Sequence, residues 1–354
     1  MNIKKSPLMA GLLALSSVFG ARAYEGEIDV KSGCFDNAPI DKVLGVSNGF
    51  VMTYRSQAKY TVPKARTVVI DGVTYPHPAG GMEVVTNSAP FVRVSLDGKQ
   101  GFASGKGVLG ANAGSLVNEQ TGVVATADED GNVFINTPNG NALGGFTTTT
   151  NKVYAQEHAT SPAKLKSPVA YMYDENNIII LGINTGNTAI GSVTRAVKSG
   201  DRFDVTKQNG REHAPYFPTM ATQSDDKVYF SDGNGIISYD AKNTSDATRT
   251  EVVSGTVKEM AVAGGKLFWT TGTELYCDGT PSVFNLNGAQ MTGMVSDGTT
   301  LYVGNTNGTS YATSLGGVPV RYVDGAAKLI SSQENGKTAI YKMTLQNQFE
   351  RINN

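Results

Sequence analysis

The sequence contains few of the residues that build catalytic and metal sites. Its 354 residues include three histidines, two cysteines and one tryptophan. It has no Gly-x-Ser-x-Gly nucleophile elbow, no phosphate-binding P-loop and no His-Glu-x-x-His zinc helix. These absences exclude the common hydrolase, nucleotide-binding and metalloprotease motifs, and they favour a protein that is not an enzyme.

Long runs of helix-forming Ala, Leu, Glu and Lys are also missing. Glycine is abundant, at 41 residues, and Asn, Thr and Ser are frequent throughout. This composition is typical of many short strands joined by tight turns, so the fold class is predicted to be all-β. The chain has 30 basic and 31 acidic residues and no basic cluster. We therefore expect no nucleic-acid partner, because the phosphate backbone would meet no excess of positive charge.

One apolar run near the N-terminus resembles a leader for export. Lys4 and Lys5 precede an apolar stretch over residues 8–19, and Ala21-Arg22-Ala23 resembles a cleavage site with small residues. The run is too short to span a bilayer, which takes roughly 20 apolar residues. We expect residues 1–23 to be a signal peptide and residues 24–354 a single domain, without a membrane span, in the periplasm or outside the cell.

The two cysteines, Cys34 and Cys277, form an exact pair in a chain expected to enter an oxidising compartment. Such a pair suggests one disulfide, which would close a very long loop. Two buried free thiols are the alternative, since the sequence does not give the separation of the two Cα atoms.

Internal repeats organise the rest of the chain. Each repeat consists of an apolar strand, a turn rich in Asp, Asn and Gly, and a second alternating strand. The eight units span residues 42–54, 91–104, 122–137, 168–183, 218–240, 257–279, 291–317 and 327–343. From Phe50 to Thr338, which open the second strand of the first and last units, seven steps average about 41 residues, the period of four-stranded propeller blades.

The repeats predict a β-propeller with eight blades, and seven is the runner-up because unit 91–104 is short and rich in glycine. A β-sandwich is the rival fold, but it gives no reason for eight similar units. A ring of blades must also close. We expect an N-terminal strand near residues 25–30 to supply the outer strand of the last blade.

Three segments resemble a known repeat signature. "YFSD" (residues 229–232) is similar to the Tyr-Trp-Thr-Asp signature of lipoprotein-receptor-type propellers, and "FWTT" (268–271) and "LYVGN" (301–305) are looser copies. In that family the signature packs and braces the blades. The resemblance therefore implies a blade architecture and a structural role for these residues, and it implies no ligand.

Two segments share a tripeptide, Glu157-His158-Ala159 and Glu212-His213-Ala214, each just before a predicted inner strand. The third histidine, His77, lies in a segment predicted to be another return between blades. Histidine and carboxylate together could bind a divalent metal or an anion, or act in general base catalysis. The alternative is that these residues are repeat sequence that has drifted, with each histidine packed at the end of a blade.

Two classes of function follow. The first is an exported, non-enzymatic propeller that binds a protein or glycan partner, or scaffolds an envelope complex, as a monomer without a cofactor. The second is a metal-assisted lyase or hydrolase whose divalent metal would be held by His158 and His213 at the propeller mouth. The sequence alone does not separate them, because propellers host both roles.

Overall fold

The computed structural model describes residues 27–29, 42–47, 50–54, 58–70, 73–87, 91–96, 100–103, 114–127, 130–138, 146–154, 165–184, 193–208, 218–241, 250–280, 284–285, 290–305, 314–334, 336–344 and 348–353. For β1 and β4 to β7 the description is of the backbone.

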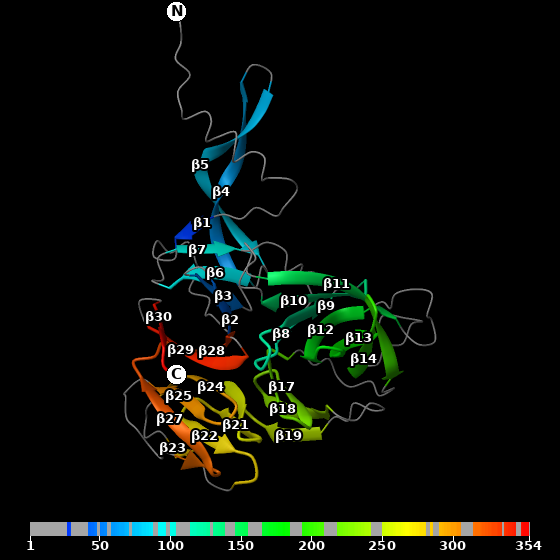
Figure 1. Ribbon diagram of the computed structural model, residues 1–354, viewed down its shortest axis with the longest axis vertical. Coiled ribbons are helices and arrows are strands. Elements are labelled where there is room, and N and C mark those ends of the chain that lie inside the picture. Colours follow the sequence, from blue (N-terminus) through cyan, green and yellow to red (C-terminus); the bar gives the residue numbers. More distant parts are fainter. Residues whose placement is uncertain are drawn as a thin grey trace, which may run out of the picture.

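These residues form strands and no helix, and the strands fall into seven sheets (Figure 1). The all-β prediction is confirmed. The first half of the chain contains β1 Glu27–Asp29, β2 Lys42–Ser47, β3 Phe50–Tyr54, β4 Ala58–Ile70, β5 Val73–Asn87, β6 Phe91–Ser95, β7 Gln100–Ala103, β8 Gly114–Val117, β9 Val124–Ala127, β10 Asn132–Pro138, β11 Phe146–Tyr154, β12 Leu165–Asp174, β13 Asn177–Asn184, β14 Val193–Ser199 and β15 Arg202–Gln208. The second half contains β16 Met220–Gln223, β17 Lys227–Ser231, β18 Gly235–Asp240, β19 Thr250–Ser254, β20 Glu259–Ala263, β21 Lys266–Thr270, β22 Glu274–Cys277, β23 Phe284–Asn285, β24 Met291–Ser296, β25 Leu301–Asn305, β26 Ser314–Leu315, β27 Val318–Asp324, β28 Lys328–Glu334, β29 Lys337–Met343 and β30 Phe349–Arg351.

The repeat pattern located most hairpins correctly. In unit 218–240 the three predicted strands are β16, β17 and β18, and β19 completes a four-stranded antiparallel sheet. Unit 257–279 likewise forms β20, β21 and β22, joined by β23. The reason is local: alternating apolar residues form each strand, and glycines with positive φ such as Gly233 and Gly265 form the turns.

The first two units do not form separate sheets. Strand β3 of unit 42–54 pairs with β6 of unit 91–104, so that β2, β3, β6 and β7 share one sheet. The predicted closing strand is also wrong. Residues 27–29 form β1, which pairs with β7 at the edge of this first sheet, whereas the last sheet contains β28, β29 and β30.

Units three and four share one sheet of eight strands that closes on itself. Strands β8 to β11 and β12 to β15 form two antiparallel halves. Two short parallel pairings join them: β8 with β12, and β11 with β15. An apolar cluster between the halves includes Val133, Ile180 and Phe203, all fully or almost fully buried. The two halves therefore pack face to face as well as edge to edge.

Unit 291–317 departs from the predicted order. The strand beside β25 is β27, which runs parallel to it, and β26 lies at the outer edge. The prediction that residues 309–317 supply the strand next to β25 is therefore wrong. Residues 318–324, which form β27, supply that strand instead.

A long hairpin interrupts the first sheet between β3 and β6. Its strands β4 and β5 pair with each other over residues 58–87 as a separate two-stranded sheet. In Figure 1 this hairpin projects away from the other sheets. The repeat pattern did not predict it, because the hairpin stands outside the repeat.

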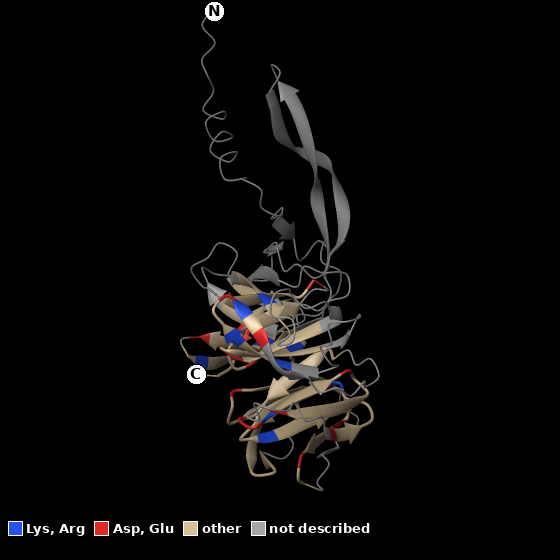
Figure 2. Ribbon diagram, turned by 90° about the vertical axis from the view of Figure 1, so that its right-hand side faces the viewer, with Lys and Arg blue, Asp and Glu red and all other residues tan. Residues whose placement is uncertain are grey.

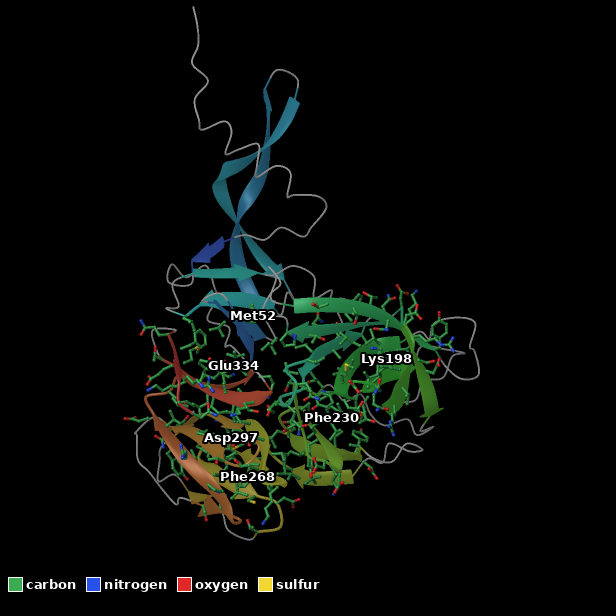
Figure 3. All side chains as sticks on the ribbon, viewed as in Figure 1. Met52, Lys198, Phe230, Phe268, Asp297 and Glu334 are labelled. Carbon is green, nitrogen blue, oxygen red and sulfur yellow. The ribbon has the colours of Figure 1, made fainter. Side chains whose placement is uncertain are left out.

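Apolar clusters bury each sheet against its neighbour. One cluster joins the β12–β13 strands to the β16–β18 sheet and includes Tyr171 and Phe230; another joins the β20–β22 sheet to the β24–β27 sheet and includes Phe268 (Figure 3). Similar clusters join β17–β18 to β20–β21, and β24–β25 to β28–β29. Strand β2 lies beside β28, so the first and last sheets are neighbours as well.

The third residue of two signature-like segments, 229–232 and 268–271, has a structural role in this protein. Ser231 Oγ accepts a hydrogen bond from Gly233 N at 3.1 Å, and Thr270 Oγ1 accepts one from Gly272 N at 2.8 Å. In both copies a hydroxyl at the third position of the signature satisfies the backbone N–H of a turn glycine with positive φ. The equivalent position in two sheets therefore has the same bracing role.

This bracing predicts a measurable loss of stability. Replacing Thr270 with Val preserves the shape but leaves the buried Gly272 N–H without its acceptor, so we expect a loss of about 1–3 kcal/mol in the free energy of unfolding. Urea denaturation would measure it. The matched control is Thr273→Val at an exposed position of the same turn, where we expect a change within about 0.5 kcal/mol. Equal effects of the two substitutions would contradict the role of the hydroxyl.

Candidate functional site

The turn between β8 and β9, residues 118–123, is called the central turn here because its residues form hydrogen bonds with β12, β16 and β28. Asn118 is 1% exposed. Its Nδ2 donates to the carbonyl oxygens of Met172 and Tyr173, at 2.9 and 3.2 Å, at the end of β12. Its Oδ1 accepts from the backbone N–H groups of Gln120 and Thr121, at 2.9 and 3.3 Å, which shapes the turn.

Gln223, at the end of β16, ties the same turn to a second sheet. Its Oε1 accepts from Asn118 Nδ2 at 3.2 Å and from the Tyr171 hydroxyl at 2.8 Å, and its Nε2 donates to Gln120 Oε1 at 3.1 Å. Burial raises the pKa of Tyr171 well above its ordinary value, and the nearby charge of Glu119 acts in the same direction. Tyr171 therefore stays a neutral donor throughout the physiological pH range.

The central turn also reaches the first and last sheets. Gln333 Nε2, near the end of β28, donates to the Glu119 carbonyl oxygen at 2.8 Å. A Cβ on Gly122, whose φ is +71°, would lie 3.4 Å from the Leu44 carbonyl oxygen of β2. The ends of β12, β16 and β28 thus meet at one turn.

The two ends of the sheets differ in how the strands are connected. At the end with the central turn, the connections from β12 to β13, β16 to β17 and β20 to β21 are the short turns 175–176, 224–226 and 264–265. At the opposite end, called the loop end here, lie the longest connections. These are residues 55–90, which include the β4–β5 hairpin, and residues 104–113, 155–164 and 209–219. Binding residues in proteins concentrate in such loops on a rigid scaffold, so the loop end is the candidate site.

Four of the predicted site residues belong to connections at the loop end. Glu157 and His158 lie between β11 and β12, and Glu212 and His213 lie between β15 and β16. Each pair thus stands in a connection between two consecutive strands, and the prediction that these connections are returns between blades stays a prediction. The four residues themselves are outside the described part of the chain, and their convergence on a ligand stays a prediction.

His77 has a different position from the predicted one. It is part of β5, where it pairs with Arg66 of β4, and the hairpin connects two strands of the same sheet. The prediction that His77 lies in a return between blades is therefore wrong. A role of this residue in ligand binding stays a prediction.

Cys277 is buried in β22, and burial raises the pKa of its thiol above the usual value. Its Sγ lies 3.6 Å from the Asp278 carbonyl oxygen. Cys34 is outside the described residues, as is the predicted signal peptide, so the disulfide and the cleavage after residue 23 stay predictions.

Within the described ranges, no group of three or more His, Cys, Asp or Glu residues could hold a metal ion. No helix in that part of the chain is long and apolar enough to cross a membrane. Lys and Arg are interspersed with Asp and Glu along the described ribbon in the view of Figure 2.

The central turn was not among the features predicted from the sequence. A local signal was present, since Asn is a common turn residue whose side chain accepts from the backbone N–H two residues later, as Asn118 does from Gln120. The partners of Asn118 on β12 and β16, however, lie 54 to 105 residues away. No spacing within one repeat predicts a bond between repeats.

Comparison with known proteins assigns no family. No protein-family model matches the chain, and no curated protein matches it. Similar solved structures include nidogen in its complex with laminin, with a TM-score of 0.35, 11% identity and coverage of 86% of this chain and 91% of that one. They also include AztD from Citrobacter koseri, with a TM-score of 0.40, 13% identity and coverage of 86% and 80%. An extracellular domain from B. thetaiotaomicron has a TM-score of 0.36, 11% identity and coverage of 90% and 40%. These TM-scores and identities are too low for a ligand or an activity of those proteins to be inferred for this chain.

Proposed function

We propose that this protein is an exported, non-enzymatic β-propeller that binds a protein or glycan partner through its loop end. The observation that carries the proposal is the asymmetry between the two ends of the sheets. At one end, hydrogen bonds join the central turn to β12 of its own sheet and to the sheets of β16 and β28, whereas the longest connections gather at the other end. A braced scaffold with long loops at one end is the arrangement that proteins use for recognition.

We further propose seven blades. The first sheet supplies one, the two halves of the eight-stranded sheet supply two, and the sheets that begin with β16, β20, β24 and β28 supply four. Two contacts support this count. The inner strands β8 and β12 run parallel, as neighbouring blades require, and β2 lies beside β28. The sequence count of eight exceeds it by one because units 42–54 and 91–104 share a sheet.

Loop replacement tests the binding end. Residues 155–164 and 209–217 are replaced together by Gly-Ser segments of equal length, and residues 241–249, which connect β18 to β19 at the end with the central turn, are replaced in the control. The proteins are then assayed against a glycan panel and by cross-linking in the envelope fraction. We expect a defined partner of the native protein to lose at least tenfold in affinity for the first variant and little for the control. Binding that survives the first variant, or the absence of any saturable partner, would overturn the proposal.

Metal analysis separates this proposal from the metal-assisted enzyme. We expect the purified native protein and the His158→Ala/His213→Ala double variant to contain the same substoichiometric metal, and the variant to keep the unfolding midpoint and partner affinity of the native protein. One equivalent of a divalent metal in the native protein that is lost in the double variant would favour the enzyme instead.

A further inference from the structure

Two stacked aromatic rings lie on the face of the β20–β23 sheet that is turned toward the β16–β19 sheet. Trp269 of β21 and Tyr276 of β22 stand opposite each other in the register of these neighbouring strands (Figure 1). Their ring centroids are 5.3 Å apart and their planes are 6° from parallel. Trp269 packs against the apolar cluster that joins β17–β18 to β20–β21, which anchors the pair, and both side chains stay partly exposed.

Glu274 places a carboxylate beside this pair. It stands two residues before Tyr276 on β22, and its Oε2 accepts a hydrogen bond from the Tyr276 hydroxyl at 2.7 Å. This bond, together with burial, raises the pKa of Tyr276 above its ordinary value, so the hydroxyl stays a neutral donor at physiological pH. Lys258 lies beside Gly272 in the adjacent turn, but no described Lys or Arg forms an ion pair with Glu274. The partly exposed carboxylate can therefore accept further hydrogen bonds.

Trp269, Glu274 and Tyr276, called the aromatic platform here, lie toward the loop end. The turn 264–265 that precedes β21 is at the end with the central turn. The turn 271–273, which joins β21 to β22, is therefore at the opposite end, and Trp269 and Glu274 stand close to it on either side. The platform thus belongs to the end of the sheets that is proposed to bind a partner.

The chemistry of the platform fits a cation better than a sugar. The described side chains next to Trp269 on this face, Met260 and Leu267, are apolar and buried. A sugar needs several converging donors and acceptors, whereas the hydroxyl of the platform is already donated to Glu274. A cation needs only a ring face within about 6 Å and a carboxylate to balance its charge. Both are present.

The protein contains the same combination elsewhere with its cation in place. Tyr154 of β11 and Asp204 of β15 are partners in the strand register. The guanidinium of Arg202 lies over the Tyr154 ring, 5.1 Å from the centroid, and its Nε is 2.9 Å from Asp204 Oδ1. A planar guanidinium stacks on a ring and binds a carboxylate at once, whereas an ammonium acts as a point charge. In the described part of the chain no such cation lies over Tyr276.

We propose that the aromatic platform binds an arginine side chain of a partner protein. The guanidinium stacks on the Tyr276 ring and donates to the Glu274 carboxylate, as Arg202 does with Tyr154 and Asp204. Arginine is enriched at protein interfaces, where it supplies much of the binding energy. The inference rests on the proposed function, since it names the chemistry of the partner at one part of the loop end, and it selects a protein over a glycan.

The single tryptophan of the chain gives a direct readout, because Trp269 is part of the platform. The purified protein is titrated with N-acetyl-arginine amide while the one indole N–H resonance is followed by NMR. We expect a saturable shift, and about fivefold weaker binding of N-acetyl-citrulline amide, which has nearly the same shape without the charge. Methyl glucoside should leave the resonance unchanged. A resonance that responds equally to the arginine and citrulline probes, or to the glucoside alone, would overturn the proposal.

Two substitutions test the roles of the carboxylate and the ring. Glu274→Gln removes the charge but keeps an acceptor for the Tyr276 hydroxyl, and Tyr276→Ala removes the ring. We expect each to weaken binding of the arginine probe by about fivefold or more, with little change in the unfolding midpoint for Glu274→Gln. The matched control is Glu175→Gln, at an exposed position of the turn 175–176 at the opposite end, which should bind the probe like the native protein. Undiminished binding in Glu274→Gln would contradict the proposal.

The partner itself separates this inference from the proposed function. We expect a partner recovered through the loop end to lose about fivefold in affinity for Glu274→Gln and nothing for Glu175→Gln. A partner that binds Glu274→Gln as tightly as the native protein would overturn the arginine site and leave the binding function in place. The absence of any saturable partner would overturn the proposed function, and the partner's arginine with it.

Discussion

Replacing Asn118 with Asp is expected to cost about 3–5 kcal/mol in the free energy of unfolding at neutral pH. The side chain is almost fully buried, and its Nδ2 points at three acceptors: the Met172 and Tyr173 carbonyl oxygens and Gln223 Oε1. A carboxylate of the same shape would place negative charge against these oxygens and donate nothing to them. Chemical denaturation at pH 7 measures the loss.

The same variant has a predictable pH dependence. The acceptors around the new carboxyl raise its pKa in the folded state above about 3.9, the value of an unperturbed aspartate. The deficit is therefore present at neutral pH and shrinks as the pH falls, because below about pH 4 the carboxyl is protonated in both states. The matched control, Gln120→Glu, adds the same charge at an exposed position of the central turn and should cost less than about 1 kcal/mol. An Asn118→Asp protein as stable as the native one at pH 7 would contradict the network of the central turn.

Replacing Phe230 with Ala should cost about 3–5 kcal/mol. Phe230 is 0% exposed and packs edge-to-face between Tyr171 of β12 and Tyr239 of β18, with ring centroids 5.5 and 5.7 Å away (Figure 3). Its removal leaves a cavity at the contact between two sheets. Thermal or urea unfolding of the purified variant measures the effect.

Phe349 of β30 offers the matched control, since it is the same residue type at a partly exposed position in an edge strand. We expect Phe349→Ala to cost about 1–2 kcal/mol, because most of the transfer and cavity energy is absent there. If the two substitutions destabilise the protein equally, the packing between sheets does not dominate its stability.

Much of the fold could be predicted from the sequence because its signals are local. Alternation in Lys227–Ser231 and Lys266–Thr270, and glycine in the turns beside them, identify hairpins whose strands lie within about a dozen residues of each other. The signature-like segments were also assigned a structural role, and the hydroxyls of Ser231 and Thr270 have one. The same residues predict little about a ligand.

The candidate site could be predicted only in outline. The tripeptides at Glu157 and Glu212 were predicted to lie between strands, and they fall between β11 and β12 and between β15 and β16; their role as returns between blades stays a prediction. His77 was placed wrongly because a histidine flanked by prolines resembles a loop, whereas proline is also tolerated at the edge of a hairpin.

The sequence by itself determined the class of structure and the position of most hairpins, since strand period and turn chemistry act between neighbouring residues. Only the tertiary structure decided which hairpins share a sheet, where the N-terminal strand pairs and which end of the sheets is braced. Those outcomes depend on contacts such as β3 with β6, β1 with β7 and Asn118 with Gln223. Each of these joins segments tens of residues apart, and any exposed strand edge could in principle accept any other. The free energy of packing the whole chain selects among those pairings, and no single repeat contains that information.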